Sequence, residues 1–127
     1  MSRLIARWAE CLFWLARYME RAENLARLLE VQQTFARDSR GAQDWGVVLA
    51  INADSARFHE TRADASPAAV IRFYTVDRSN PTSILADLFA ARENARALRP
   101  MIPTELWMQL NTFYNRVAAI SPASVGE

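Results

Sequence analysis

Apolar residues recur at steps of three and four along the first third of the chain, which is the spacing of one face of an α-helix. Phe13 and Trp14 extend this face to a second side. Because a helix that is apolar on more than one side is usually covered on more than one side, we expect this helix to be central. The predicted apolar arc consists of Trp8, Cys11, Leu12, Leu15, Tyr18, Met19, Ala22, Leu25, Ala26 and Leu29.

Start signals divide the rest of the chain into shorter helices. Ser66-Pro67 and Asn80-Pro81 each combine a capping side chain with a proline at the first helical position. Polar residues around Gly41 predict a turn over 38–42. The expected helices span residues 2–35, 44–57, 67–76, 81–99 and 103–120. This pattern predicts an all-α bundle of about five helices, with one domain over 1–120 and a loose tail over 121–127.

Composition narrows the function classes. The chain has 127 residues and a formal net charge of only +1, so no overall electrostatic case exists for nucleic acid or an anionic membrane. All 15 cations are Arg, and Lys is absent. Genomic base composition is the simpler explanation for the absence of Lys. The planar guanidinium of Arg, however, also forms paired hydrogen bonds with carboxylates and phosphates, which the Lys ammonium does not.

Cysteine and histidine usage bears on crosslinks and metals. With one Cys and one His, the chain forms no internal disulfide, and a zinc site made of protein ligands is not expected. Cys11 lies in an apolar stretch and is expected to be a small core residue. No apolar run approaches the roughly 20 residues that span a bilayer, and no signal peptide is recognisable. We therefore expect a cytoplasmic protein without metal or cofactor.

Charged residues gather in the middle of the first helix, and a second group lies on the predicted helix over 81–99. Arg17 and Glu20 are spaced i,i+3, and Glu23 and Arg27 are spaced i,i+4, so the two members of each pair can contact each other. Arg92, Arg96 and Arg99 form one stripe that borders the apolar arc of their own helix. The candidate site residues are Arg17, Glu20, Arg21, Glu23, Asn24, Arg27, Arg92, Glu93, Asn94 and Arg96.

Two interpretations of this cluster compete. In the structural one, the two charged groups form an ion-pair network that fixes how the two helices pack, since arginines beside a core need acceptors. In the functional one, surplus Arg side chains line a cleft and bind a carboxylate or phosphate ligand. A solvated surface is the remaining alternative. The sequence favours the structural interpretation.

Other familiar sites are missing from the sequence. A di-iron bundle needs Glu-x-x-His pairs, and the single His59 has no such spacing. The three glycines form no phosphate-binding loop, and no Ser, His and Asp set is recognisable. Acidic residues are interleaved with the arginines throughout, which makes nucleic acid binding unlikely.

The ordered motifs resemble those of a known family. Residues 13–29, with Arg17-Tyr18-x-Glu20-Arg21-Ala22-Glu23-Asn24 at their centre, resemble the opening motif of the bacterial Alpha-E family. The resemblance continues with Asn80-Pro81-x-Ser83-Ile84, Ala91-Arg92-Glu93-Asn94-Ala95-Arg96, Glu105-x-Trp107 and Leu110-Asn111, and it covers nearly the whole chain.

The resemblance implies a helical domain and a type of partner. Alpha-E proteins are associated with ATP-grasp-type ligases and transglutaminase-like proteins, which implies a role in making or modifying peptide or amide bonds. Family members are usually longer and carry a second Glu-Arg-Ala helix, which nothing after Tyr114 supplies here. The chain resembles the first half of the family, so we expect uncovered apolar surface and a homo-oligomer, or a missing second half.

Two functions follow from these observations. The first is a non-catalytic helical module that partners an ATP-grasp-type ligase or a transglutaminase-like protein. The second is an enzyme, or enzyme fragment, in which Arg17, Arg21, Arg92 and Arg96 hold a carboxylate or phosphate ligand. Glu20 or Glu93 would then be the acid–base candidate.

Overall fold

The computed structural model describes residues 2–38, 44–62 and 64–125, and every regular element within them is helical. Two 3₁₀ turns, Arg99–Met101 and Pro122–Ser124, follow the last two helices. The six α-helices are α1 (Ser2–Asp38), α2 (Gly46–Ile51), α3 (Ser55–His59), α4 (Pro67–Thr75), α5 (Ile84–Ala97) and α6 (Thr104–Ala118). The prediction of an all-α fold built on a long N-terminal helix is confirmed.

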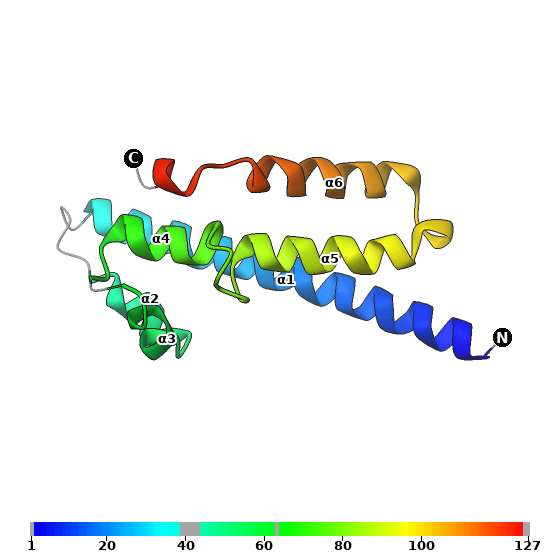
Figure 1. Ribbon diagram of the computed structural model, residues 1–127, viewed down its shortest axis with the longest axis horizontal. Helices are drawn as coiled ribbons and strands as arrows, with labels where there is room; N and C mark the ends of the chain where they lie inside the picture. Colours follow the sequence, from blue (N-terminus) through cyan, green and yellow to red (C-terminus); the bar gives the residue numbers. More distant parts are fainter. Residues whose placement is uncertain (1, 39–43, 63, 126–127) are drawn as a thin grey trace.

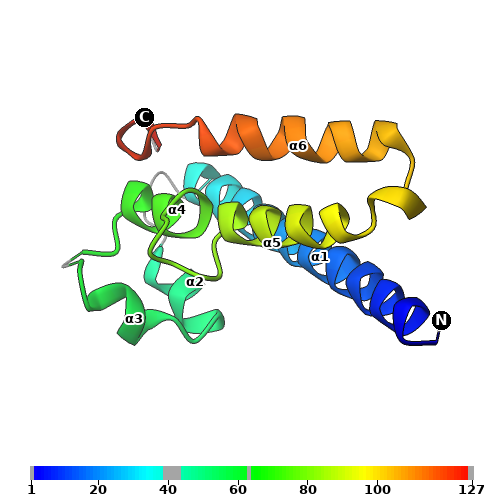
Figure 2. The ribbon, with the colours of Figure 1, turned by 45° about the vertical axis from the view of Figure 1, so that its right-hand side comes forward.

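α5 packs against α1 on one side and against α6 on another. α4 and α5 follow one another along nearly one line, and α6 runs back antiparallel to α5 (Figure 1). In Figure 2, α1 crosses behind α5, and its N-terminal turns extend beyond the end of α5. Leu4 and Ile5 in these turns are accordingly exposed.

α1 buries a narrow seam. Leu15, Ala22, Leu29 and Gln32 are buried, and residues between them, such as Leu25, are half-buried, so the steps alternate between four and three residues. This mean spacing of about 3.5 residues is typical of two helices that pack along their length. The predicted arc was too broad, because its members Leu12, Met19 and Ala26 are exposed.

Two clusters of buried side chains hold the bundle together. One joins the C-terminal half of α1 to α2, α3 and α4, through Leu29, Trp45, Val48, Leu49, Phe58, Val70, Phe73 and Tyr74. The other joins the N-terminal half of α1 to α5 and α6, through Leu15, Ala91, Ala95, Leu98 and Leu110. The two halves of α1 thus serve different cores, and the hollows described below lie where these cores meet.

The helix predicted over 44–57 is two helices. The chain leaves α2 at Asn52, and Ala53 adopts a left-handed conformation with φ of 57°. Asp54 then begins α3, and its backbone N–H donates to the Leu49 carbonyl at 2.8 Å. The helical prediction was wrong here because helical spacing does not reveal a single residue with positive φ. The turn predicted over 38–42 falls largely on residues 39–43, outside the described residues.

Capping residues place the starts of α4 and α5. Ser66 caps α4 by accepting a hydrogen bond from the Ala69 amide, as predicted. α5 begins three residues later than predicted, because Ser83 rather than Asn80 is its cap. The buried Asn80 side chain instead donates to the Phe73 carbonyl at 2.9 Å and accepts from the Thr82 amide. Asn80 thereby ties the turn before α5 to α4.

The chain after α6 contacts α4. The Arg72 guanidinium donates to the Pro122 carbonyl at 2.6 Å, and Arg78 donates to the Ala118 carbonyl at 3.3 Å. Pro122–Ser124 form a 3₁₀ turn within the predicted tail. Residues 126–127 lie outside the described part of the chain.

Candidate functional site

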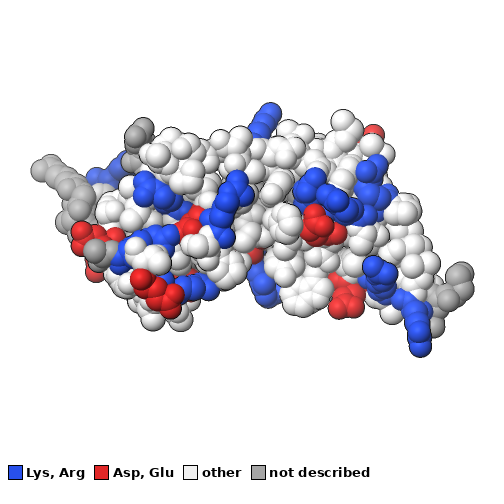
Figure 3. Space-filling model, in the orientation of Figure 1, with Lys and Arg blue, Asp and Glu red and all other residues white. Residues whose placement is uncertain are grey.

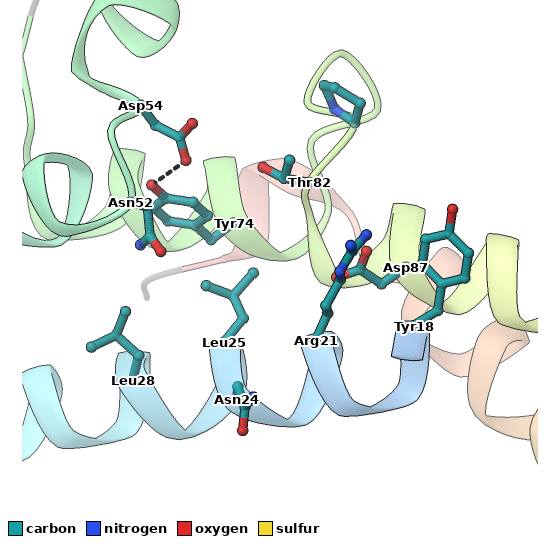
Figure 4. A pocket seen from close by; sticks show the side chains of 11 residues that line it. Tyr18, Arg21, Asn24, Leu25, Leu28, Asn52, Asp54, Tyr74, Thr82 and Asp87 are labelled. Atoms are coloured by element: carbon teal, nitrogen blue, oxygen red, sulfur yellow. Dashed lines mark hydrogen bonds between the residues drawn. The ribbon is translucent and has the colours of Figure 1, made fainter. Parts of the chain in front are cut away.

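A pocket of about 440 Å³ lies between α1, the α2–α3 turn, α4 and the start of α5 (Figure 4). Its wall combines charged, hydroxyl, amide and apolar side chains from four segments that are distant in the sequence. The lining residues are Tyr18, Arg21, Asn24, Leu25, Leu28, Asn52, Asp54, Tyr74, Pro81, Thr82 and Asp87. Three candidate or adjacent residues of the charged stretch, Tyr18, Arg21 and Asn24, are therefore on this wall.

Arg21 is held by aromatic rings. Its guanidinium carbon lies 5.8 Å from the Trp14 ring centre and 5.4 Å from the Tyr18 ring centre. Cation–π contacts of this kind orient a guanidinium without using its N–H donors. No hydrogen bond or ion pair joins Arg21 to another described residue. The N–H groups of the Arg21 guanidinium are therefore available to donate hydrogen bonds into the pocket.

Asp87 is the second unpaired charge. It lies in the first turn of α5, and the residue is only 5% exposed. Within the described chain, no group donates a hydrogen bond to its carboxylate. Burial raises the pKa of Asp87 to about 6, and the nearby Arg21 charge opposes this rise. Figure 4 shows the carboxyl beside the Arg21 guanidinium, and the amide dipoles of the α5 N-terminus also favour the negative charge.

Side chains of the opposite wall form hydrogen bonds with one another and with Arg57. The buried Tyr74 hydroxyl donates to Asp54 Oδ2 at 2.7 Å, and Arg57 Nη2 donates to Asp54 Oδ1 at 2.5 Å. Arg57 also donates to the Thr82 hydroxyl at 3.1 Å. Burial, together with the bond to Asp54, raises the pKa of Tyr74, so the hydroxyl remains a donor at neutral pH. This wall is a fixed support, whereas Arg21 and Asp87 keep free bonding capacity.

The candidate residues on α1 pair within their own helix. Arg17 lies 3.7 Å from Glu20, and Arg27 donates to Glu23 at 2.7 Å; all four side chains are well exposed. On α5, Arg92 and Arg96 each approach Glu93 to 3.6 Å, and Asn94 donates to the Ala90 carbonyl. Among the described residues, no ion pair joins the α1 cluster to the α5 cluster.

Two arginines of the predicted stripe, Arg92 on α5 and Arg99 in the 3₁₀ turn after it, contact α6 rather than α1. Arg92 Nε donates to Asn111 Oδ1 at 2.6 Å, and its guanidinium lies over the Tyr114 ring. Arg99 lies over the Trp107 ring, 4.8 Å from its centre. The stripe was expected to meet acids of the first helix. Its bonds instead place α6, because the rotation of α5 about its axis turns these side chains away from α1.

The Arg21 charge on α1 acts on Asp87 of α5, although no ion pair joins these two described residues, and the sequence interpretation missed Asp87. A signal was present. Asp87 precedes Ala91 by four residues and therefore lies on the apolar stripe of its own helix. An acid at such a position is buried, and a buried acid needs a partner or a ligand. Asp54, Tyr74 and Thr82 carried no comparable signal.

A second hollow lies on the other flank of α1. This groove of about 500 Å³ runs between α1 and α6 and is mostly apolar, lined by Ala16, Met19, Glu20, Ala22, Glu23, Ala26, Ile84 and Phe113. Neighbouring residues of α1 thus serve different hollows, because Glu20 borders the groove whereas Arg21 borders the pocket.

A family model matches residues 4–125, and its description is a predicted alpha-helical domain with a conserved ER motif. The chain belongs to the Alpha-E family. Glu20-Arg21 is the single Glu-Arg dipeptide in the sequence, so it is the ER motif of this Alpha-E chain. No match was found among the curated proteins or among the solved structures.

The surface of this Alpha-E domain mixes charges of both signs. On the face shown in Figure 3, arginines and acids alternate, with broad uncharged areas between them. The described part of the chain contains no group of three or more His, Cys, Asp or Glu side chains that could hold a metal ion. None of the helices in residues 2–38, 44–62 and 64–125 is both long and apolar enough to cross a membrane.

Proposed function

We propose that this Alpha-E chain is a non-catalytic helical module that binds a small carboxylate ligand in the Arg21 pocket and acts together with a protein partner. The observation that carries the ligand site is Arg21 itself. Two aromatic rings orient its guanidinium, yet no described residue accepts its hydrogen bonds. A planar fork of N–H donors matches the two oxygens of a carboxylate.

The rest of the pocket favours a small organic acid over a bare ion. Leu25 and Leu28 continue the wall along α1 from Arg21, and they suit an apolar tail. The volume of about 440 Å³ lies in the lower part of the range of small-molecule sites. Inorganic phosphate would find one cation and a neighbouring carboxylate, which is a poorer match than a single-charged acid.

A titration with 4-methylpentanoate, followed by amide and methyl NMR shifts, tests this site. We expect saturable shifts around Tyr18, Leu25 and Leu28, and a loss of affinity of about tenfold or more in Arg21→Gln. Arg17→Gln is the matched control, because Arg17 lies one turn away on α1 and outside the pocket. Shifts that do not saturate, or an Arg21→Gln variant that binds as well as wild type, contradict the proposal.

The partner is proposed to dock on the groove between α1 and α6. Met19 is 36% exposed and Phe113 48%, so large apolar side chains line this groove. Contiguous exposed apolar surface is typical of interaction sites. Glu20 and Glu23 border the groove, so the matching surface would be apolar with basic residues at its edge. The family resemblance implies that this partner is an ATP-grasp-type ligase or a transglutaminase-like protein.

Co-elution with an ATP-grasp-type ligase of the same organism, with ligase turnover measured in parallel, tests the partner. Met19→Glu is expected to abolish co-elution and any change in ligase rate. Ile51→Glu is the control, since Ile51 is exposed on α2, away from the groove. If wild type neither binds the ligase nor alters its rate, the ligase proposal fails. A stable dimer in light scattering that Met19→Glu dissociates would assign the groove to a second copy instead.

An enzyme is the second candidate, and one observation favours it. The pKa of Asp87 is about 6, close to the pH at which proton transfer is efficient. Glu20 and Glu93, the acids considered from the sequence, are exposed and engaged by arginines of their own helices. Turnover by the chain alone that Asp87→Asn abolishes would support the enzyme. Full stimulation of the ligase by Asp87→Asn would support the non-catalytic module.

A further inference from the structure

We infer that the pocket binds a free α-amino acid with an apolar side chain, held by its carboxylate on Arg21 and by its ammonium on Asp87. This inference rests on the proposed carboxylate site and names its ligand class. It starts from two opposite charges side by side on the pocket wall, both without a hydrogen-bonding partner in the described chain.

Arg21 and Asp87 lie near each other on the pocket wall but do not pair. The described structure contains no ion pair between them within 4.0 Å, although their charges interact. Arg21 is held over Trp14 and Tyr18, whereas Asp87 is fixed on the first turn of α5. Two groups anchored on different helices keep their separation, so a ligand can bridge them.

The two opposite charges on the pocket wall select the charge of the ligand. A plain carboxylate bound to Arg21 would also lie near the Asp87 carboxylate, and two like charges repel each other strongly in a partly desolvated site. A plain amine bound to Asp87 would lie near Arg21 and meet the same difficulty. A molecule with both charges on neighbouring atoms pairs with both groups and adds no net charge to the pocket.

Asp87 is a buried carboxyl group on the pocket wall. An ionised side chain that is 5% exposed needs a donor, because unpaired buried charges are costly. An ammonium supplies three donors and a full positive charge. The Asp54 carboxylate does not compete for it, since both of its oxygens already accept hydrogen bonds from Tyr74 and Arg57.

The apolar part of the pocket wall determines which amino-acid side chain fits. Figure 4 places Arg21 and Asp87 toward one end of the pocket, with Leu25 and Leu28 following along α1 toward the other. With both charged groups matched by the backbone of the amino acid, the remaining space adjoins these leucines. A branched aliphatic side chain fits this wall better than an acidic or basic one. Leucine is therefore the probe of choice.

The experiment compares leucine with its two truncated analogues, 4-methylpentanoate and 3-methylbutylamine, by calorimetry and NMR titration. We expect leucine to bind about tenfold or more tightly than either analogue, because it makes both charged contacts. Asp87→Asn should weaken leucine about tenfold while leaving 4-methylpentanoate unchanged or tighter. Arg21→Gln should weaken both ligands, and Arg17→Gln neither.

The outcomes separate this inference from the proposed function. If 4-methylpentanoate binds through Arg21 but leucine binds no tighter, the amino acid is the wrong ligand and the carboxylate site stands. If leucine affinity survives Asp87→Asn, the ammonium contact is refuted. If neither compound binds, both proposals fall. Circular dichroism on each variant verifies its fold, and glutamate and arginine test the preference for an apolar side chain.

Discussion

Arg92 on α5 donates a hydrogen bond from Nε to Oδ1 of Asn111 on α6, at 2.6 Å. Asn111 is held in turn, because its amide donates to the Trp107 carbonyl of its own helix at 2.8 Å. The Tyr114 ring lies under the same guanidinium. Arg92 was expected to join α5 to α1, but it positions α6. Arg21 of the Alpha-E motif, by contrast, borders the pocket.

The Arg92–Asn111 bond should be measurable as a coupling in stability. We expect Arg92→Ala to lower the free energy of unfolding by about 1.5–3 kcal/mol, since a half-buried, charge-assisted bond is lost. A double-mutant cycle with Asn111→Ala in urea should give a coupling of about 1–2 kcal/mol. Arg96→Ala is the control, because Arg96 is exposed and pairs only at 3.6 Å with Glu93. A coupling no larger than that of an Arg96/Asn111 cycle contradicts the assignment.

Asp87 should make stability depend on pH. Its pKa rises from 3.8 when unfolded to about 6 in the folded chain. Between these values the folded state binds more protons than the unfolded state, so the free energy of unfolding falls as the pH rises through this window. The loss is complete above pH 6 and amounts to roughly 3 kcal/mol at most.

Asp87→Asn tests this dependence by urea unfolding from pH 3.5 to 7.5. The variant is expected to be more stable than wild type at pH 7, by up to roughly 3 kcal/mol, because it has no buried charge. The difference should shrink as the pH falls below 6. Glu105→Gln, at an exposed position in the first turn of α6, should change stability little at any pH. A wild-type curve parallel to that of Asp87→Asn would show that Asp87 keeps an ordinary pKa.

Tyr74→Phe removes the hydroxyl that donates to Asp54 on the pocket wall. We expect the free energy of unfolding to fall by about 1–2 kcal/mol, since a buried bond to a charged acceptor is lost without a change in shape. Chemical denaturation measures the effect. Tyr114→Phe is the control, because the Tyr114 hydroxyl bonds to no other described residue. Equal losses in both variants would mean that the Asp54 bond contributes nothing specific.

Ala53 stands at a left-handed position between α2 and α3, with φ of 57°. Glycine adopts this conformation without the Cβ clash, which costs other residues roughly 1–2 kcal/mol. The higher conformational entropy of the unfolded glycine variant offsets part of this gain. We therefore expect Ala53→Gly to stabilise the fold by about 0.5 kcal/mol. The same change at exposed Ala50 in α2 should destabilise by up to about 1 kcal/mol. Thermal unfolding measures both, and matching signs would refute the strain.

Local signals in the sequence predicted much of the fold. The three- and four-residue steps of α1 predicted a broader apolar arc than the seam that is buried. They did predict a long N-terminal helix, because helical hydrogen bonds link residues that are near in sequence. Ser66-Pro67 predicted the start of α4 for the same reason. Asn80-Pro81 misled, since Asn80 bonds to Phe73 and Thr82 in a turn and the cap is Ser83.

What the sequence determined by itself was therefore the all-helical class, the helices α1, α4, α5 and α6, the Glu20-Arg21 stretch and the charged pairs within α1. Only the tertiary structure decided which charges meet. Arg21 faces Asp87, and Arg92 faces Asn111, because the rotation and crossing of whole helices orient these side chains. Those rotations depend on the volumes of all the buried side chains together. Two residues on the same turn of α1, Glu20 and Arg21, consequently border different hollows.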